Sequence, residues 1–355
     1  GGREEGLVAR RLHLVGGQGL RLLKRLVDRL LARQSGGELL PDLGADAGEF
    51  RDRHELHADI GNRIHGRVQR VSRIDRLQRH FGKGRCGEIG LVLIERAART
   101  RRHVRPALVL GDQLDHDATV IRELDPELDA ILMTEVDAEA AGSGAGIRSH
   151  KQRTAFFLSA MRHFALGQMD AGIRVRYIKL DAPQNTHALG TELKRAVRVL
   201  SPKLIRMTQP GEWRVLDEIE DAAAEADTEL EIVDDSHFFT TPGDFEKWAK
   251  GRKSLTMEYF YREQRRRIGY LMDGDDPEGG EWNYDKQNRE TFKSAPDIPS
   301  LYQPQTDDIT KAVIELVEAR YPNNPGSLDK FIWPVTRDQA RRALKRFIET
   351  RLDDF

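Results

Sequence analysis

Three groups of polar residues each follow a predicted strand, and their side chains have chemistry to offer. Gly111–Gln113 follow the first strand, Glu135 and Glu139 follow the second, and residues 209–214 (Gln-Pro-Gly-Glu-Trp-Arg) follow the fourth. In an open α/β sheet, ligands bind outside the carboxyl ends of the strands, where the strand order reverses. At this position the three groups would offer backbone N–H groups, carboxylates, an amide and an aromatic edge. Such a set suits a heteroaromatic ligand with hydrogen-bond donors and acceptors on its rim.

The common phosphate and metal motifs are not found in this sequence. A dinucleotide fingerprint needs G-x-G-x-x-G after the first strand, and only Gly111 is there. We interpret the glycine-rich stretch 142–146 as a loop rather than a phosphate cradle. No P-loop, H-E-x-x-H or Cys/His array occurs, and no serine lies on a strand-to-helix elbow. The single cysteine, Cys86, excludes a disulfide framework, a four-cysteine zinc site and an iron–sulfur cluster built from this chain alone.

The elements that must position these groups alternate between strands and helices. Short apolar runs predict five strands, at 107–110, 130–134, 175–180, 204–207 and 230–233. Apolar residues at helical spacing predict helices over 150–168, 188–200 and 212–226. Because such alternation gives βαβ units with right-handed crossovers, residues 106–240 are expected to form an α/β domain with a Rossmann-like, doubly wound parallel sheet.

Beyond residue 241 the pattern becomes helical. A helical connector is expected over 241–306. It would contain a short capped turn at 244–250, a long helix at 254–271, a Gly/Asp turn at 273–280 and a Pro-rich linker at 290–306. Helices at 307–320 and from 336 onward are expected to begin an all-α domain, of which residues 307–355 would be the truncated start. We interpret Arg265–Arg267 as a solvated helix face.

Charge divides the 355-residue chain into two unlike parts. The formal net charge is −1, but residues 1–105 hold 23 basic and 13 acidic residues, nearly all of the basic ones arginine. This Arg-rich stretch lacks a coherent apolar pattern, so we interpret it foremost as an extension that is not native protein or is disordered. A partly helical arm, a folded module and a nucleic-acid-binding arm remain alternatives.

No stretch approaches the roughly 18 apolar residues that a membrane-spanning helix needs, and the first residues do not form a charged-then-apolar leader. We therefore expect a soluble, cytoplasmic monomer.

In the absence of other information, His150 and His163 are interpreted as surface or capping residues. The aromatic stripe around Phe157 is interpreted mainly as core, with one position free to line a pocket.

Several long motifs resemble, in order, the bacterial deoxyribodipyrimidine photolyase-related proteins, the iron–sulfur branch of the cryptochrome/photolyase family that includes bacterial (6-4) photolyases. The resemblance spans about residues 106–355. It rests on Leu-Val-Leu-Gly-Asp-Gln-Leu at 108–114, Thr-Glu-Val at 134–136, His-Lys-Gln-Arg at 150–153, Phe-Leu-Ser-Ala-Met-Arg-His-Phe at 157–164, Gln-Pro-Gly-Glu-Trp-Arg at 209–214, Gly-Arg-Lys-Ser-Leu-Thr-Met-Glu-Tyr-Phe-Tyr-Arg-Glu at 251–263, Gly-Gly-Glu-Trp-Asn-Tyr-Asp at 279–285 and Val-Thr-Arg at 335–337.

The resemblance implies a flavoprotein that repairs pyrimidine lesions in damaged DNA by light-driven electron transfer from reduced FAD. The α/β domain of such proteins holds an antenna chromophore, a ribityllumazine in this branch, and the helical domain holds FAD and a 4Fe–4S cluster. By residue matching, the resemblance implies an antenna pocket formed by Gly111, Asp112, Gln113, Glu139 and Phe157, with His150 near its rim. No catalytic or metal-binding residue is assigned within this chain.

The sequence departs from the family pattern in two places. The link between Glu139 and His150 is longer and richer in glycine than usual, and the FAD and cluster sites of the family would lie beyond Phe355. We therefore expect this chain to hold mainly the antenna domain. The alternative is a stand-alone α/β ligand-binding or blue-light sensory module without repair activity.

Overall fold

The computed structural model describes residues 105–140, 148–283 and 299–351. These residues form two compact units, one made of 105–237 with 305–336, the other of 238–304 with 337–351. The Arg-rich extension predicted for residues 1–105 lies outside the described residues, except for Arg105. The boundaries predicted at 240 and 306 stay predictions, but residues 305–336 pack with the α/β unit.

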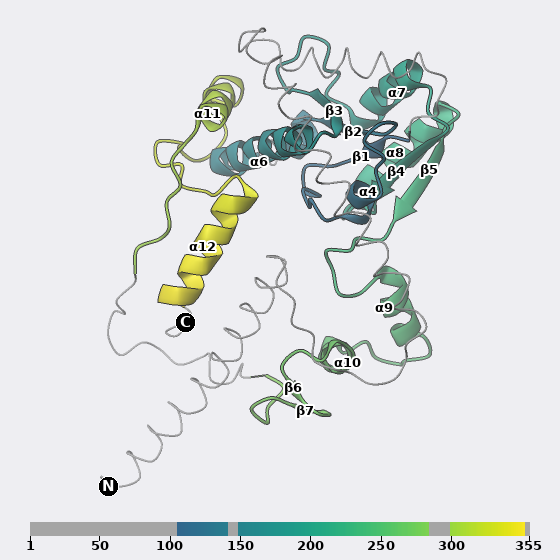
Figure 1. Ribbon diagram of the computed structural model, residues 1–355, viewed down its shortest axis with the longest axis vertical. Helices are drawn as coiled ribbons and strands as arrows, with labels where there is room; N and C mark the ends of the chain where they lie inside the picture. The colour runs from purple at the N-terminus through teal and green to yellow at the C-terminus, as the bar shows by residue number, and fades with distance from the viewer. Residues whose placement is uncertain (1–104, 141–147, 284–298, 352–355) are drawn as a thin grey trace. The chain divides into compact units, whose positions relative to one another are not determined.

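The first unit is built on a five-stranded parallel sheet of order β3-β2-β1-β4-β5 (Figure 1). Its strands are β1 (Ala107–Leu108), β2 (Ala130–Thr134), β3 (Arg174–Ile178), β4 (Leu204–Thr208) and β5 (Glu229–Val233). This arrangement confirms the predicted doubly wound, Rossmann-like α/β fold. The strand order reverses between β1 and β4, so a crevice is expected at the carboxyl ends of these two strands.

Helices cover both faces of this sheet because residues along each buried strand point alternately to the two sides. Ala107 and Val109 join one core with α4 (Thr119–Arg122), α6 (Lys151–Asp170) and α11 (Asp308–Arg320). Leu108 and Leu110 join a second core with α7 (Leu189–Leu200) and α8 (Trp213–Glu225). The short helix α5 (Asp137–Ala140) follows β2 at the carboxyl edge.

The second unit is mainly helical, with α9 (Pro242–Ala249), α10 (Met257–Ile268), α12 (Arg337–Thr350) and a hairpin of β6 (Met272–Asp273) and β7 (Asp276–Pro277). A capping box of Thr241 and Asp244 starts α9. Helix α10 is shorter than the predicted 254–271, because Gly269 ends it in the left-handed region at φ 75°. No described helix of either unit is long and apolar enough to cross a membrane.

Candidate functional site

The end of β1 lies directly under an aromatic ring from α6. A Cβ atom placed on Gly111 would lie 2.3 Å from Cζ of Phe157 and 2.8 Å from Sδ of Met161. Only glycine therefore fits at this position while Phe157 keeps its place. The structure thus brings together two of the predicted site residues, Gly111 and Phe157, at the carboxyl edge of the sheet.

Gln113 joins the two strands between which the strand order reverses. Its Nε2 donates to the backbone oxygens of Thr208, at 3.0 Å, and Gln209, at 3.1 Å, both at the end of β4. Both amide hydrogens are therefore used inside the protein. The prediction that this amide bonds the edge of a ligand ring stays a prediction, but these two bonds would have to break first.

Asp112 lies beside other carboxylates at the same edge. Partial burial of its carboxyl group, together with the negative charges of Glu212 and Asp235, raises the pKa of Asp112 above its ordinary value. The edge next to β4 is therefore acidic. It suits a ligand that presents hydrogen-bond donors rather than a phosphate.

Glu139 and Phe157 are connected through Arg153. The Arg153 guanidinium lies over the Phe157 ring, 5.7 Å from its centroid, and its Nη1 contacts the Glu139 backbone oxygen at 3.4 Å and Ser149 Oγ at 3.0 Å. The Glu139 carboxylate accepts a hydrogen bond from Arg214 Nη2 at 2.8 Å through Oε1. Arg153 therefore links the Phe157 ring to the Glu139 backbone, and Arg214 pairs with the Glu139 carboxylate.

His150 does not face this group of side chains. It is the N-cap of α6, and its Nδ1 accepts a hydrogen bond from the Gln152 backbone N–H at 3.2 Å. Its ring lies against Gly326, because a Cβ there would come within 2.1 Å of His150 Nε2. The capping interpretation of His150 therefore fits the structure, and its predicted place near the pocket rim stays a prediction.

A buried network around Glu135 was not anticipated from the sequence. The Glu135 side chain is fully buried and accepts hydrogen bonds from Arg162 Nε at 2.7 Å and Nη2 at 2.9 Å, Tyr177 Oη at 2.6 Å and the Leu180 backbone N–H at 2.7 Å. Burial and the adjacent Glu135 charge raise the pKa of Tyr177, so this phenol stays protonated. Every donor is satisfied, and the network fixes the end of β2 rather than offering a reactive group.

A second network ties α5 to α11. Asp137 accepts hydrogen bonds from Arg320 Nε at 2.9 Å and Nη2 at 2.7 Å, from the Tyr321 hydroxyl, and lies 3.1 Å from His187 Nδ1. Partial burial alone would raise the pKa of Asp137, but the bonds from Arg320 and Tyr321 outweigh it and lower that pKa. Asp137 precedes Glu139 by two residues, so this clamp holds the helix that carries the candidate ligand residue.

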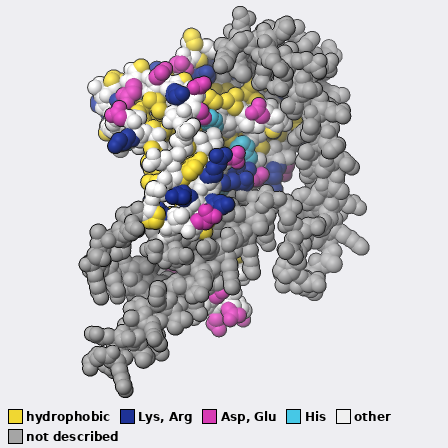
Figure 2. All heavy atoms as spheres, turned by 60° about the vertical axis from the view of Figure 1, so that its left-hand side comes forward, with side chains coloured by type: hydrophobic (Ala, Val, Ile, Leu, Met, Phe, Trp, Pro, Cys, Tyr) yellow, Lys and Arg dark blue, Asp and Glu magenta, His cyan; other side chains and the backbone are white. Residues whose placement is uncertain are grey.

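Polar side-chain contacts also connect α6 to α11 and to the residue that caps it. Lys151 pairs with Glu318, and His163 Nε2 lies 3.0 Å from Asp307. Figure 2 shows basic, acidic and His side chains interleaved on this side of the molecule rather than gathered in blocks of one sign.

In the part of the chain that the structure describes, no group of three or more His, Cys, Asp or Glu side chains could hold a metal ion.

Comparison with known proteins places these features in a family. The sequence profile of the deoxyribodipyrimidine photo-lyase-related proteins matches residues 107–333. The chain belongs to this family. The matched range includes β1 to β5, the candidate site residues Gly111, Glu139 and Phe157, and Arg320 of the clamp.

A curated relative gives a second comparison. The (6-4) photolyase of Agrobacterium fabrum is 44% identical to this chain over 253 residues, which is 70% of this chain and 48% of that protein. The chain thus spans about half the length of the photolyase that it matches. The family resemblance inferred from the sequence motifs is confirmed.

Proposed function

We propose that this photolyase-related chain supplies the antenna-binding part of a light-driven DNA repair flavoprotein that acts on pyrimidine lesions. The observation that carries the proposal is the cluster at the carboxyl edge of the sheet, where the Arg153 guanidinium lies over the Phe157 ring and its Nη1 contacts the Glu139 backbone oxygen. Membership of the family and the name of the Agrobacterium relative support the link to repair. Reduced FAD would supply the electron, and lesion flipping would expose the damaged base.

The residues of this cluster fit a ribityllumazine in chemistry. Such an antenna absorbs light and passes the excitation to the flavin. The Phe157 ring offers an aromatic surface, but the space between that ring and Gly111 is filled. A flat ligand would therefore pack on the outer face of Phe157. The Glu139 carboxylate, whose side chain is 20% exposed, would accept from ring N–H or ribityl hydroxyl groups.

The protein residues would bind and orient the ligand. Arg153 holds the Glu139 backbone and covers Phe157, and Arg214 fixes the direction of the Glu139 carboxylate. A flat ligand that packs on Phe157 would take the place of the Arg153 guanidinium over the ring, while the Arg214 bond already sets the direction of the Glu139 carboxylate. Preorganisation of this kind reduces the cost of ordering side chains when a ligand binds.

A titration of the purified chain with ribityllumazine, followed by fluorescence, tests the antenna role. Gly111→Ala should displace the Phe157 ring and weaken binding at least tenfold, by the cost of overpacking a filled site. Gly243→Ala in the second unit is the matched control, because a Cβ there meets only Thr241 Oγ1 at an ordinary contact distance of 3.6 Å. Equal affinities for wild type and both variants, with the fold intact, would contradict the antenna assignment.

The repair role is tested in cells. Deleting the gene that encodes this chain should remove the light-dependent part of recovery from ultraviolet damage, while recovery in the dark stays the same. Unchanged recovery under blue light would contradict the repair role. If the chain still bound the lumazine, that result would favour the sensory or ligand-binding alternative.

A further inference from the structure

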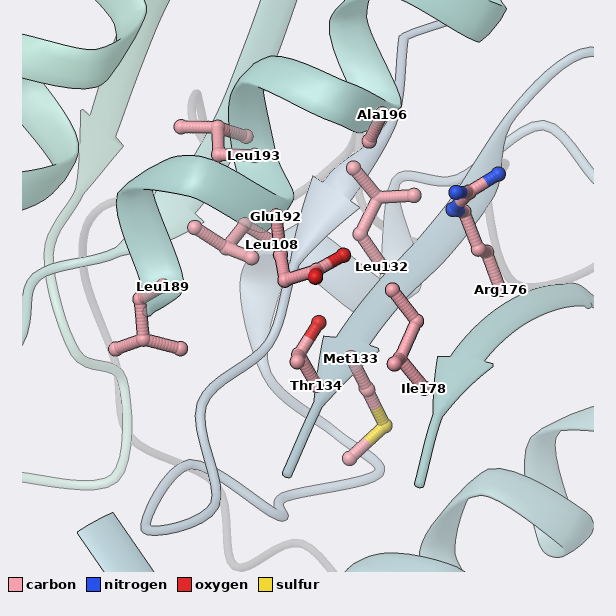
Figure 3. Close-up of a pocket in the computed structure, with 10 residues that line it drawn as sticks. All are labelled: Leu108, Leu132, Met133, Thr134, Arg176, Ile178, Leu189, Glu192, Leu193 and Ala196. Atoms are coloured by element: carbon pink, nitrogen blue, oxygen red, sulfur yellow. The ribbon is translucent and has the colours of Figure 1, made fainter. Parts of the chain in front are cut away.

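A small hollow lies between the strands and α7, on the face of the sheet opposite α6. Its walls come from the ends of β1, β2 and β3 and from one side of α7, and most of them are apolar: Leu108, Leu132, Met133, Ile178, Leu189, Leu193 and Ala196 (Figure 3). Its polar lining comes from Thr134, Arg176 and Glu192. The hollow is far smaller than a drug-sized site and has room for about one water molecule.

Glu192 brings a carboxylate into this hollow, although its side chain is only 2% exposed. One oxygen, Oε1, accepts hydrogen bonds from the Thr186 backbone N–H, the Thr186 hydroxyl and Arg195 Nη1, each at 2.9 Å. The other oxygen, Oε2, is buried, and no described residue donates a hydrogen bond to it. Figure 3 shows the Thr134 hydroxyl on the side of this carboxylate.

A bare carboxylate oxygen in an apolar surrounding is costly, because it has lost its water and gained no donor in return. The hollow beside Glu192 is polar at one end and has room for one small molecule. A small hydrogen-bond donor bound there would remove the desolvation cost of the unpaired oxygen. We propose that the Glu192 hollow is a binding site for one buried water molecule, which donates to Glu192 Oε2 and bonds the Thr134 hydroxyl. This water would link the first turn of α7 to the end of β2.

The hydrated hollow would also support the residues at the carboxyl edge of the sheet. Glu192 holds Thr186, and the preceding residue, Asn185, donates from Nδ2 to the Glu135 backbone oxygen at 2.7 Å. The following residue, His187, contacts Asp137. The loop over 185–187 therefore connects the hydrated hollow to both networks at the carboxyl edge.

A crystal structure of the full chain at a resolution that shows ordered solvent tests the proposal directly. We expect density within hydrogen-bond distance of Glu192 Oε2 in ammonium-free buffer. A hollow without density would overturn the proposal. Density that appears only in ammonium salts would overturn the assignment to water, since ammonium has the same size and also donates.

A substitution series gives a second test in solution. Ala196→Val should expel the water and raise the unfolding equilibrium constant by roughly tenfold more than the control Ala224→Val, an exposed α8 position with the same change in helix propensity. In a Glu192→Leu background, which needs no water, the excess loss at Ala196 should vanish. If Ala196→Val stabilises the chain, or if it costs the same in both backgrounds, the hollow is dry and the proposal is overturned.

Discussion

The two faces of the parallel sheet are built in contrasting ways. The α6 face carries three ion pairs, Arg162 with Glu135, Arg320 with Asp137 and Lys151 with Glu318, and a contact of His163 with Asp307. The α7 face has a mainly apolar core with Arg195 paired to Glu192 and Lys194 to Glu225, and its buried Glu192 keeps one oxygen without a described donor. Three of the four contacts on the α6 face use residues after 305. The segment 305–336 therefore supplies polar partners to one face of the sheet, whereas these pairs on the other face lie within α7 and α8.

The largest expected effect comes from breaking the buried network on the α6 face. Arg162→Met should destabilise the chain by about 3–5 kcal/mol, because it leaves the buried Glu135 charge without its cation. Urea unfolding followed by circular dichroism measures this loss. The double variant with Glu135→Gln should recover part of the stability. A single variant as stable as wild type would show that the pair is not isolated from solvent.

The next effect concerns the Gly111 and Phe157 contact. Gly111→Ala should cost about 1–3 kcal/mol, since its methyl group would overlap the Phe157 ring. Adding Phe157→Leu should restore much of that loss by making room for the methyl group. Thermal unfolding of the two single variants and the double variant gives the coupling between the sites. Additive losses would mean that the ring does not occupy the space over Gly111.

The Asp137 clamp should make stability depend on pH in a defined direction. Because the pKa of Asp137 is lowered in the folded chain, its contribution is complete above its unfolded pKa of about 3.9 and is lost as the pH falls through the folded value. Arg320→Gln should cost about 0.5–1.5 kcal/mol at pH 7, a modest amount for partly exposed groups. Urea unfolding from pH 7 to pH 3 should show the difference between wild type and variant shrinking with acid. A difference that grew on acidification would contradict the assignment.

The smallest effect on stability is expected for the exposed Arg214 side chain, which pairs with Glu139. Arg214→Gln should change stability by about 0–1 kcal/mol, because the Arg214 side chain is 46% exposed and its ion pairs are screened by water. A thermal unfolding scan at low and high salt is sufficient to measure it. A larger loss would show that Arg214 has a structural role like that of Arg162.

The sequence predicted the sheet well because its signals are local. Apolar runs such as 130–134 lie on single strands, and the glycine and proline residues between elements mark the turns. The partners of Glu135 could not be found in this way, since Arg162 and Tyr177 lie 27 and 42 residues away. The pairing of Arg320 with Asp137 spans 183 residues. Such long-range pairs depend on how helices cross the sheet, and no periodicity encodes that.

The assignment of the candidate site stays a prediction, although the structure brings some of its residues together. The fold places Gly111 and Phe157 in contact and connects Glu139 to Phe157 through Arg153. The capping role of His150 was expected from the sequence, whereas the internal bonds of Gln113 were not, because they depend on Thr208, which lies 95 residues away. The type of a side chain determines which hydrogen bonds it can make. Its neighbours in the fold determine whether its donors and acceptors remain available to a ligand.

The most direct test of the account is the affinity of ribityllumazine for the residues around Phe157 and Glu139 at the carboxyl edge. Fluorescence titration should give a defined 1:1 affinity for wild type and a loss of about 1.5–3 kcal/mol for Glu139→Gln, which replaces the charged acceptor. Glu229→Gln, an exposed carboxylate on β5, should bind like wild type. Equal binding by wild type and both folded variants would contradict the placement of the antenna at the carboxyl edge.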